Sequence, residues 1–383
     1  MSSRFVIAIL MVASAIHIAA AQSSAPASNL KSNIDTLSSF DYSSRMNAAR
    51  ALRRVAPAEV VPALIEATRR HADEFVRYRA LIVLTSFNDR STPELMRTLL
   101  QDRNDRVREV AYRWFERNPE PALSPSLLSA LNTEQSEFVR PALVRAVAAL
   151  PSNDAGRRAL VAEIGRGFDF FRSAVIDALG DYRATYAVDA ITAVALADGP
   201  LQDDAVLALG RIGDRRALVT LSTLTNTSGD VAAALQAAQC MLGDTCAPRI
   251  EWLTTTARSQ TVRPEAVRAA IASLGAIAQQ DPVARTALLG LAQDGSERVT
   301  HEVALAFSGI ALRRPNDVLM WLSTAPEGER SRVIELLRDG FESLEEDFAE
   351  EQFFASIRAS YWKEAEGSSA RTLVATLIEK LEF

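Results

Sequence analysis

Two glycines three residues apart, followed by an acid and two arginines, stand in the segment DDAVLALGRIGDRRALVTLSTL at residues 203–224. Glycine turns of this kind bind phosphate when a strand precedes them and Gly-Lys-Ser/Thr opens the next helix. Neither feature surrounds Gly210, Gly213 and Asp214, and related LGD sequences recur at 179–181 and 242–244. Recurrence favours a structural role, in which glycine ends one helix in a left-handed conformation and aspartate caps the next.

Histidine is scarce, which restricts metal and nucleophile chemistry. Beyond His17 the chain has only His71 and His301, more than 200 residues apart. Neither has a third ligand within helical reach, and no Ser, His and Asp set can be assembled from local sequence. We therefore predict no catalytic residue, no metal site and no cofactor, and we do not expect an enzyme.

The two cysteines, Cys240 and Cys246, stand in QCMLGDTCAP. In an exported chain this spacing across a tight turn favours a disulfide, because thiols oxidise outside the cytoplasm. The alternative is a pair of small buried thiols, and the sequence alone does not supply the geometry that bridging requires.

Acids and arginines recur three residues apart and form a predicted structural ladder. Residues at this spacing share a helix face, and the acid lies where a helix start favours negative charge. We predict that the ladder links neighbouring units, with a row of guanidinium groups for an anionic ligand as the alternative. The pairs are Glu74 with Arg77, Asp105 with Arg108, Glu137 with Arg140, and Asp169 with Arg172.

These pairs belong to a repeat that organises the chain. The matching apolar positions Val76, Val107, Val139 and Phe171 are separated by 31, 32 and 32 residues. Within each unit apolar residues recur at three and four and are interrupted once, which indicates two helices. Weaker matches continue the register, so roughly ten units are expected, as in a solenoid. They lie at Arg45, Gln202, Val231, Val262, Val299 and Arg330.

The pattern ALGRIGDRRALVTL and the D-x-V-R-x-x-A starts resemble HEAT repeats, particularly the short HEAT-like repeats of phycobilin lyases. The resemblance implies an all-α fold, an α-solenoid of stacked antiparallel helix pairs, from about residue 41 to the end. It also implies that second helices line the concave side. It says little about function, because scaffolds, adaptors and a few enzymes share these repeats.

The first residues predict export. One arginine, an apolar run from Phe5 to about Ile18, and small residues at Ala19 and Ala21 match a signal peptide cleaved before Gln22. The apolar run is short for a membrane span, so we expect no span after cleavage. The alternative is an uncleaved anchor. We predict a periplasmic or secreted protein, and 39 arginines among 42 basic residues suggest a bacterial coding bias.

The predicted organisation is a signal peptide at 1–21, a flexible linker at 22–40 and a solenoid at 41–383 with one continuous core. Residues 342–367 depart from the repeat and concentrate acids and aromatics, so we predict that 342–383 form a C-terminal cap. A partner-binding knob is the alternative. The net charge of −6 argues against nucleic acid, whose phosphates favour a basic surface.

We therefore expect an exported, non-enzymatic scaffold or adaptor that binds a protein or peptide along its surface. The alternatives are an enzyme or enzyme subunit resembling bilin lyases, and anionic-ligand or nucleic-acid binding through the arginine row.

Trp252 and Trp321 each precede a leucine, and one residue of such a pair faces away from the core or toward the next unit. The candidate partner-binding residues on second helices are Asp189, Thr192, Thr220, Glu251, Trp252 and Thr254.

Overall fold

The computed structural model describes residues 27–381 except 88, 152, 226, 228 and 344–347. Within these residues the chain forms 22 α-helices and two short 3-10 turns, with no strand. The predicted all-α solenoid of helix pairs is confirmed. The predicted signal peptide lies outside the described residues. No helix within them is long and apolar enough to cross a bilayer.

The first helices of successive pairs pack against one another along the whole chain. They are α2 (Tyr42–Arg53), α4 (Glu74–Thr85), α6 (Asp105–Arg117), α8 (Arg140–Ala149), α10 (Asp169–Asp181), α12 (Gln202–Ile212), α14 (Asp230–Met241), α16 (Pro264–Ala278), α18 (Glu297–Arg313) and α20 (Glu327–Glu342). The second helices contact one another less. They are α3 (Pro57–Arg70), α5 (Thr92–Leu99), α7 (Ser124–Thr133), α9 (Asp154–Glu163), α11 (Val188–Leu196), α13 (Ala217–Leu221), α15 (Ala247–Arg258), α17 (Pro282–Asp294) and α19 (Pro315–Thr324). The 3-10 turns η1 (Pro121–Leu123) and η2 (Thr185–Ala187) precede α7 and α11.

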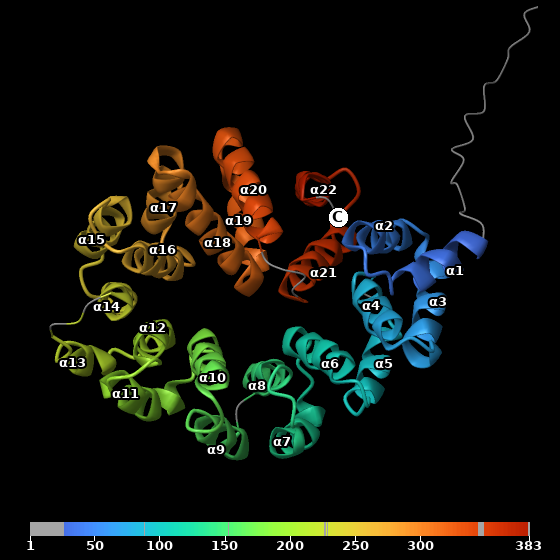
Figure 1. Cartoon of the computed structure of the whole chain (residues 1–383), viewed down its shortest axis with the longest axis horizontal. Coiled ribbons are helices and arrows are strands. Elements are labelled where there is room, and N and C mark those ends of the chain that lie inside the picture. The colour runs from blue at the N-terminus through green and yellow to red at the C-terminus, as the bar shows by residue number, and fades with distance from the viewer. Residues whose placement is uncertain are drawn as a thin grey trace, which may run out of the picture.

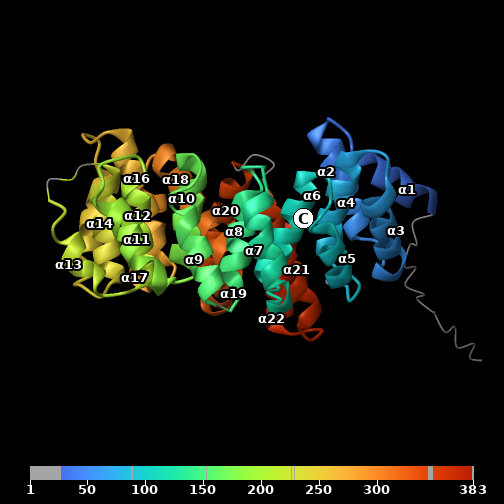
Figure 2. The same ribbon diagram turned by 90° about the horizontal axis from the view of Figure 1, so that it is seen from below.

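The stack curves into an arc whose two arms face each other (Figure 1). First helices such as α6, α8, α10 and α12 lie toward the centre, and second helices from α7 to α17 form the outer rim. The expectation that second helices line the concave side is therefore wrong. The first helices are rich in small alanines at their mutual contacts, so they approach closely and the stack bends toward them. Seen edge-on, the helices cross the thickness of the arc (Figure 2).

The segment predicted as a flexible linker instead contains helix α1 (Ala27–Thr36). Its Ile34, together with Leu37, is buried in the core formed with α2, α3 and α4. The interpretation failed because serine richness hid the apolar spacing of Leu30, Ile34 and Leu37, which is the spacing of one helix face. The prediction for 22–26 lies outside the described residues.

The buried side chains form three hydrophobic clusters rather than the single continuous core that we expected. In chain order, the clusters extend from Ile34 to Phe115, from Tyr112 to Leu242 and from Ala233 to Leu381. Half-buried leucines connect them. Leu100 and Leu123 contact the first and second clusters, and Leu207 contacts the second and third. Each repeat packs mainly on its neighbours, as in other solenoids, so the core extends along the arc in linked segments.

The glycines of the recurring Gly-Asp pairs have two different roles. Gly213 and Gly243 adopt φ of 80° and 87° and follow the ends of α12 and α14, as predicted. Gly180 does not end a helix: it lies inside α10, where an added Cβ would stand 3.1 Å from the Cα of Ala208 on α12. Gly210 similarly permits close approach of α14. Asp181 remains in the helix, so it does not cap a following one.

The last two helices, α21 (Phe348–Lys363) and α22 (Ser369–Lys380), pack on each other and on α18, α19 and α20. Phe353 and Phe354 are buried against Phe341, with ring centroids 5.0–5.7 Å apart. These aromatic side chains cover the last apolar face of the stack, which is the arrangement expected of a cap.

Candidate functional site

The arginines of the predicted ladder lie at the starts of first helices, but most bind acids other than those predicted. Arg77 pairs with Asp102, Arg108 with Glu134, and Arg140 with Glu163. Each of these acids ends a second helix or follows it, directly before the next first helix. Of the four predicted i,i+3 pairs, only Asp169–Arg172 is an ion pair, at 2.8 Å. Three of these ion pairs therefore join the start of a first helix to the end of the second helix in the same repeat, while Arg77 and Arg108 also donate to backbone carbonyls of the preceding repeat, those of Thr68 and Asp102. None of the four arginines is free of an acid for an anionic ligand.

The predicted acids also reach the next repeat. Glu74 lies 2.9 Å from a guanidinium nitrogen of Arg103 and accepts from Asn104 at 3.3 Å. Asp105 accepts a hydrogen bond of 2.8 Å from the Ser136 hydroxyl. The sequence predicted acids and arginines in fixed register that link neighbouring units, but it did not identify the loop residues Asn104 and Ser136 as partners of Glu74 and Asp105. Those contacts form only when the helix pairs stack.

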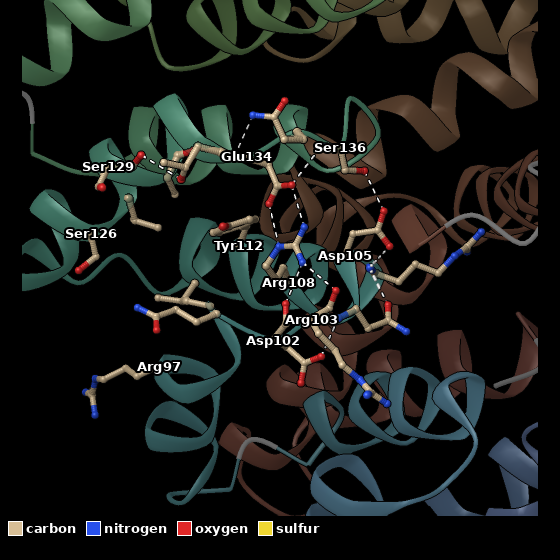
Figure 3. A pocket seen from close by; sticks show the side chains of 18 of the residues that line it. Arg97, Asp102, Arg103, Asp105, Arg108, Tyr112, Ser126, Ser129, Glu134 and Ser136 are labelled. Carbon is tan, nitrogen blue, oxygen red and sulfur yellow. Dashed lines mark hydrogen bonds and ion pairs between the residues drawn. The ribbon is translucent and has the colours of Figure 1, made fainter.

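A groove of about 1060 Å³ lies between α5 and α7 and opens where the loops before α6 and α8 meet (Figure 3). Arg108 crosses its floor and donates two hydrogen bonds of 2.8 Å to the Glu134 carboxylate. Tyr112 lies beside this pair. We call this hollow the edge groove. Its wall and rim carry both charges, so it suits polar contacts rather than a purely apolar ligand.

Burial and hydrogen bonding determine the protonation states of Glu134 and Tyr112 in the edge groove. Burial alone would raise the pKa of Glu134, but hydrogen bonds from Arg108 and the Ser136 amide lower it overall. Burial raises the pKa of Tyr112 to about 12. Both groups therefore hold one protonation state at neutral pH, so neither is poised for proton transfer there.

A row of exposed phenylalanines runs along the edge of the stack where the first helices begin. Phe75, Phe138 and Phe170 are 49%, 81% and 65% exposed. Each directly precedes one of the apolar residues that define the repeat, so the row follows the repeat register. Arg106 holds the matching position in the repeat between them, and its guanidinium lies 5.7 Å from the centre of the Tyr78 ring. Phe168, 74% exposed, extends the row beside α10. We call it the phenylalanine edge.

The predicted partner-binding residues lie elsewhere, on the outer rim, on α11, α13 and α15. Trp252 is 41% exposed there, Asp189 and Glu251 are exposed, and the three threonines are half-buried. They are therefore not gathered into a groove on the inner side. Trp321 stacks on Phe307 with ring centroids 5.6 Å apart and donates to Glu329 at 2.8 Å, so it faces a neighbouring helix.

The structure joins Cys240 and Cys246 as a disulfide, with Cα atoms 4.5 Å apart across the turn between α14 and α15. This separation lies within the range that a bridge requires. The oxidation state in the cell stays a prediction. Among the described residues, no group of three or more His, Cys, Asp or Glu side chains is arranged to hold a metal ion.

Residues 30–113 match the family model for HEAT repeats. This part of the chain is similar to HEAT repeats. No curated protein matches the sequence significantly. Among solved structures, the YibA protein of Escherichia coli is 18% identical, with coverage of 57% of this chain and 82% of that one and a TM-score of 0.43. Importin beta is 13% identical, with coverage of 92% of this chain and 64% of that one and a TM-score of 0.42.

Sequence reasoning did not identify the phenylalanine edge, although its signal was present. In EFVRYRALIVL, EFVRPALVRAVAAL and DFFRSAVIDALG, a phenylalanine stands directly before the buried apolar residue of the register. Two consecutive apolar residues at a helix start cannot both face the core, because adjacent side chains point about 100° apart on a helix. The sequence of each of these three units therefore predicts one exposed phenylalanine.

Proposed function

We propose that this chain is an exported, non-enzymatic scaffold or adaptor that binds a protein or peptide partner along its solenoid surface. The observation that carries the proposal is the phenylalanine edge. Single exposed apolar residues are common on protein surfaces, but a regular row of large ones marks an interaction site. Because the row follows the repeat, a partner that lies along the edge contacts several units at once.

The edge groove supports the same assignment. It opens beside Phe75, and its lining combines Tyr78 and Tyr112 with arginines and carboxylates. Aromatic and arginine side chains are the residues that contribute most to protein–protein binding. Apolar anchors on the edge and polar groups in the adjoining groove together resemble the core and rim of an interface.

Position-specific photocrosslinking in intact cells tests the assignment. A photoreactive amino acid in place of Phe138 or Phe170 should give a discrete adduct with one partner. The same group in place of Val219, which is 75% exposed on α13 of the outer rim, is the matched control and should give none. Equal adducts from the outer rim, or none from either edge position, would refute binding at the phenylalanine edge.

A substitution test separates binding from folding. Phe138→Ser with Phe170→Ser should abolish the adduct formed from position 75 and leave the melting temperature close to that of the wild type, because both side chains are mainly in solvent. If Val219→Ser also abolished the adduct formed from position 75, the loss would instead reflect a general effect on solubility.

Export is part of the proposal and has its own measurement. Intact mass of the protein recovered from the cell envelope should correspond to a chain that begins at Gln22. Retention of residues 1–21 would place the solenoid at a membrane surface, and recovery only from the cytoplasm would contradict export.

A further inference from the structure

The phenylalanine edge keeps one register over four successive repeats, which limits the partners that fit it. In each repeat the exposed edge residue follows an acid and precedes a buried apolar residue of the core. The edge residues are Phe75, Arg106, Phe138 and Phe170, at or just before the starts of α4, α6, α8 and α10. These helices are neighbours in the stack, so the row has no gap (Figure 1). It ends at α12, where the matching Leu201 is buried.

A similar contact joins each step of the row to the next. The acid before each edge residue reaches the loop that precedes the following first helix. The contacts are Glu74 with Asn104 at 3.3 Å, Asp105 with Ser136 at 2.8 Å, and Glu137 with Gly167, whose added Cβ would stand 3.7 Å from the carboxylate. Because the contact recurs, successive edge residues are separated by one helix-packing step, which is about 8–10 Å.

Arg106 gives the row one positive charge. Its side chain is exposed, and its guanidinium lies 5.7 Å from the centre of the Tyr78 ring. The nearby Asp105 accepts from a serine of the next loop, and Glu74 lies 2.9 Å from Arg103. Within the part of the chain that the structure describes, no carboxylate pairs with Arg106. A carboxylate of a partner can therefore approach Arg106 without displacing an acid of this chain.

Polyproline II is the regular peptide conformation whose repeat matches this spacing. It has three residues per turn and rises about 3.1 Å per residue, so every third side chain returns to the same face after about 9 Å. A β-strand repeats its faces after two residues and about 7 Å. An α-helix returns near the same face after seven residues and about 10.5 Å, beyond the packing step. Aromatic side chains are also the surfaces on which polyproline II segments pack.

We propose that the phenylalanine edge binds a polyproline II segment of a partner protein. Apolar residues of the segment lie against Phe75, Phe138 and Phe170, and an acidic residue meets Arg106. Read along the edge, the segment carries an apolar, an acidic and two apolar residues, each three positions after the last. This inference rests on the proposed function, because it names the class of partner that the same edge binds.

Fluorescence anisotropy of a labelled peptide, LPPLPPEPPLPPL, with the purified protein tests the proposal. The peptide is symmetric about its glutamate, so it presents the required pattern in either chain direction. Saturable binding of one peptide per chain is expected. Phe138→Ser with Phe170→Ser should weaken binding at least about tenfold, because two apolar anchors are lost. The peptide LPPPLPPPEPPPLPPPL, which spaces the same anchors four apart, should bind the wild type at least about tenfold more weakly, since its anchors leave the common face.

The charge of Arg106 supplies a second readout that loss of folding cannot imitate. Arg106→Glu should weaken binding of the glutamate peptide by about threefold to tenfold, and should strengthen binding of the same peptide with lysine at that position to a similar degree. Arg298→Glu is the matched control. Arg298 is exposed and holds the same register position at the start of α18, outside the row, so both affinities should stay unchanged.

Three outcomes would overturn the assignment. The first is absence of saturation up to about 1 mM peptide. The second is equal binding of the peptides with three-residue and four-residue spacing, which would show nonspecific apolar attraction. The third is tighter binding of an α-helical peptide with the same anchors seven residues apart, which would replace the polyproline II segment with a helix. An adduct from position 138 or 170 in intact cells together with any of these outcomes would reject the segment and leave the proposed function standing.

Discussion

Arg140 and Arg172 hold the same register position in neighbouring repeats but lie in different surroundings. Arg140 is buried, pairs with the buried Glu163 and has its guanidinium 3.9 Å from the centre of the Phe171 ring. Arg172 pairs with Asp169, whose side chain is 53% exposed. An ion pair screened by water contributes little to stability, whereas loss of one partner of a buried pair leaves an unpaired charge in a low dielectric.

Arg140→Ala should therefore lower the free energy of unfolding by about 1–3 kcal/mol, because the buried Glu163 would keep only Arg166, at 3.1 Å, as an ion-pair partner. Arg172→Ala should lower it by less than about 1 kcal/mol. Urea unfolding followed by circular dichroism measures both. Equal effects of the two substitutions would show that the position in the repeat, rather than burial, determines the contribution.

The Arg108–Glu134 pair predicts a dependence on pH. The folded-state pKa of Glu134 lies below its ordinary value of 4.5, so the pair contributes stability above that value and loses it as pH falls through the folded pKa. Glu134→Gln should cost about 1–3 kcal/mol at neutral pH and should lose less stability than the wild type on acidification below 4.5. Glu74→Gln, at an exposed pair, is the control, and parallel acid profiles for wild type and Glu134→Gln would contradict the assignment.

At the scale of the elements, close approach of first helices sets the shape of the stack. An added Cβ at Gly210 on α12 would lie 2.6 Å from the Cα of Ala238 on α14. The backbone at Ala238 cannot move aside as the end of a flexible side chain can, so α12 and α14 would have to separate to accommodate the added Cβ. Gly309, inside α18, has nothing within 4 Å of an added Cβ.

Gly210→Ala should thus destabilise the protein by about 1–3 kcal/mol through overpacking. Gly309→Ala should stabilise it by about 0.5–1 kcal/mol, because alanine favours the helix and nothing opposes its methyl group. Thermal unfolding of the two variants provides the measurement. Stabilisation by both would mean that the α12–α14 contact adapts freely and does not depend on glycine.

The elements were largely predictable from sequence because they depend on local spacing. Apolar residues at three and four, with a break near Gly213, predicted a helix pair, and the structure places α12 and α13 there. Gly180 was misinterpreted because a glycine that ends a helix and one that permits helix contact look alike in sequence. The distinction depends on Ala208 of the next unit, which only packing brings near.

At the scale of the whole molecule, curvature and the sites that depend on it were not predictable. Each repeat contacts mainly its neighbours, so small rotations accumulate along the stack and decide which distant residues meet. Asp177 and Arg313 are 136 residues apart and share no motif, yet they are in contact across the arc. The phenylalanine edge follows the register and could have been predicted from the sequence, whereas the contact of Arg313 with Asp177 could not.

Arg313 joins the two arms, which predicts how the shape of the arc depends on it. Its guanidinium contacts Asp177 at 2.9 Å and Asp181 at 3.6 Å, while both acids keep Arg145 and Arg211 on their own arm. Removal of Arg313 therefore frees the C-terminal arm without leaving the acids unpaired. Arg313→Ala should change shape more than it changes stability.

Spin labels at Ser126→Cys on α7 and Met320→Cys on α19 report the distance between the arms, since both positions are exposed. In Arg313→Ala the distribution of this distance should broaden toward longer values. High salt should broaden the distribution of the wild type less than this substitution does, because the Arg313–Asp177 pair is partly buried. Arg338→Ala, which removes an exposed arginine paired with Asp339 on α20, is the control and should leave the distribution unchanged. An unchanged distribution in Arg313→Ala would mean that core packing alone holds the arc closed, because the stacked helices would then keep their curvature without any contact between the arms.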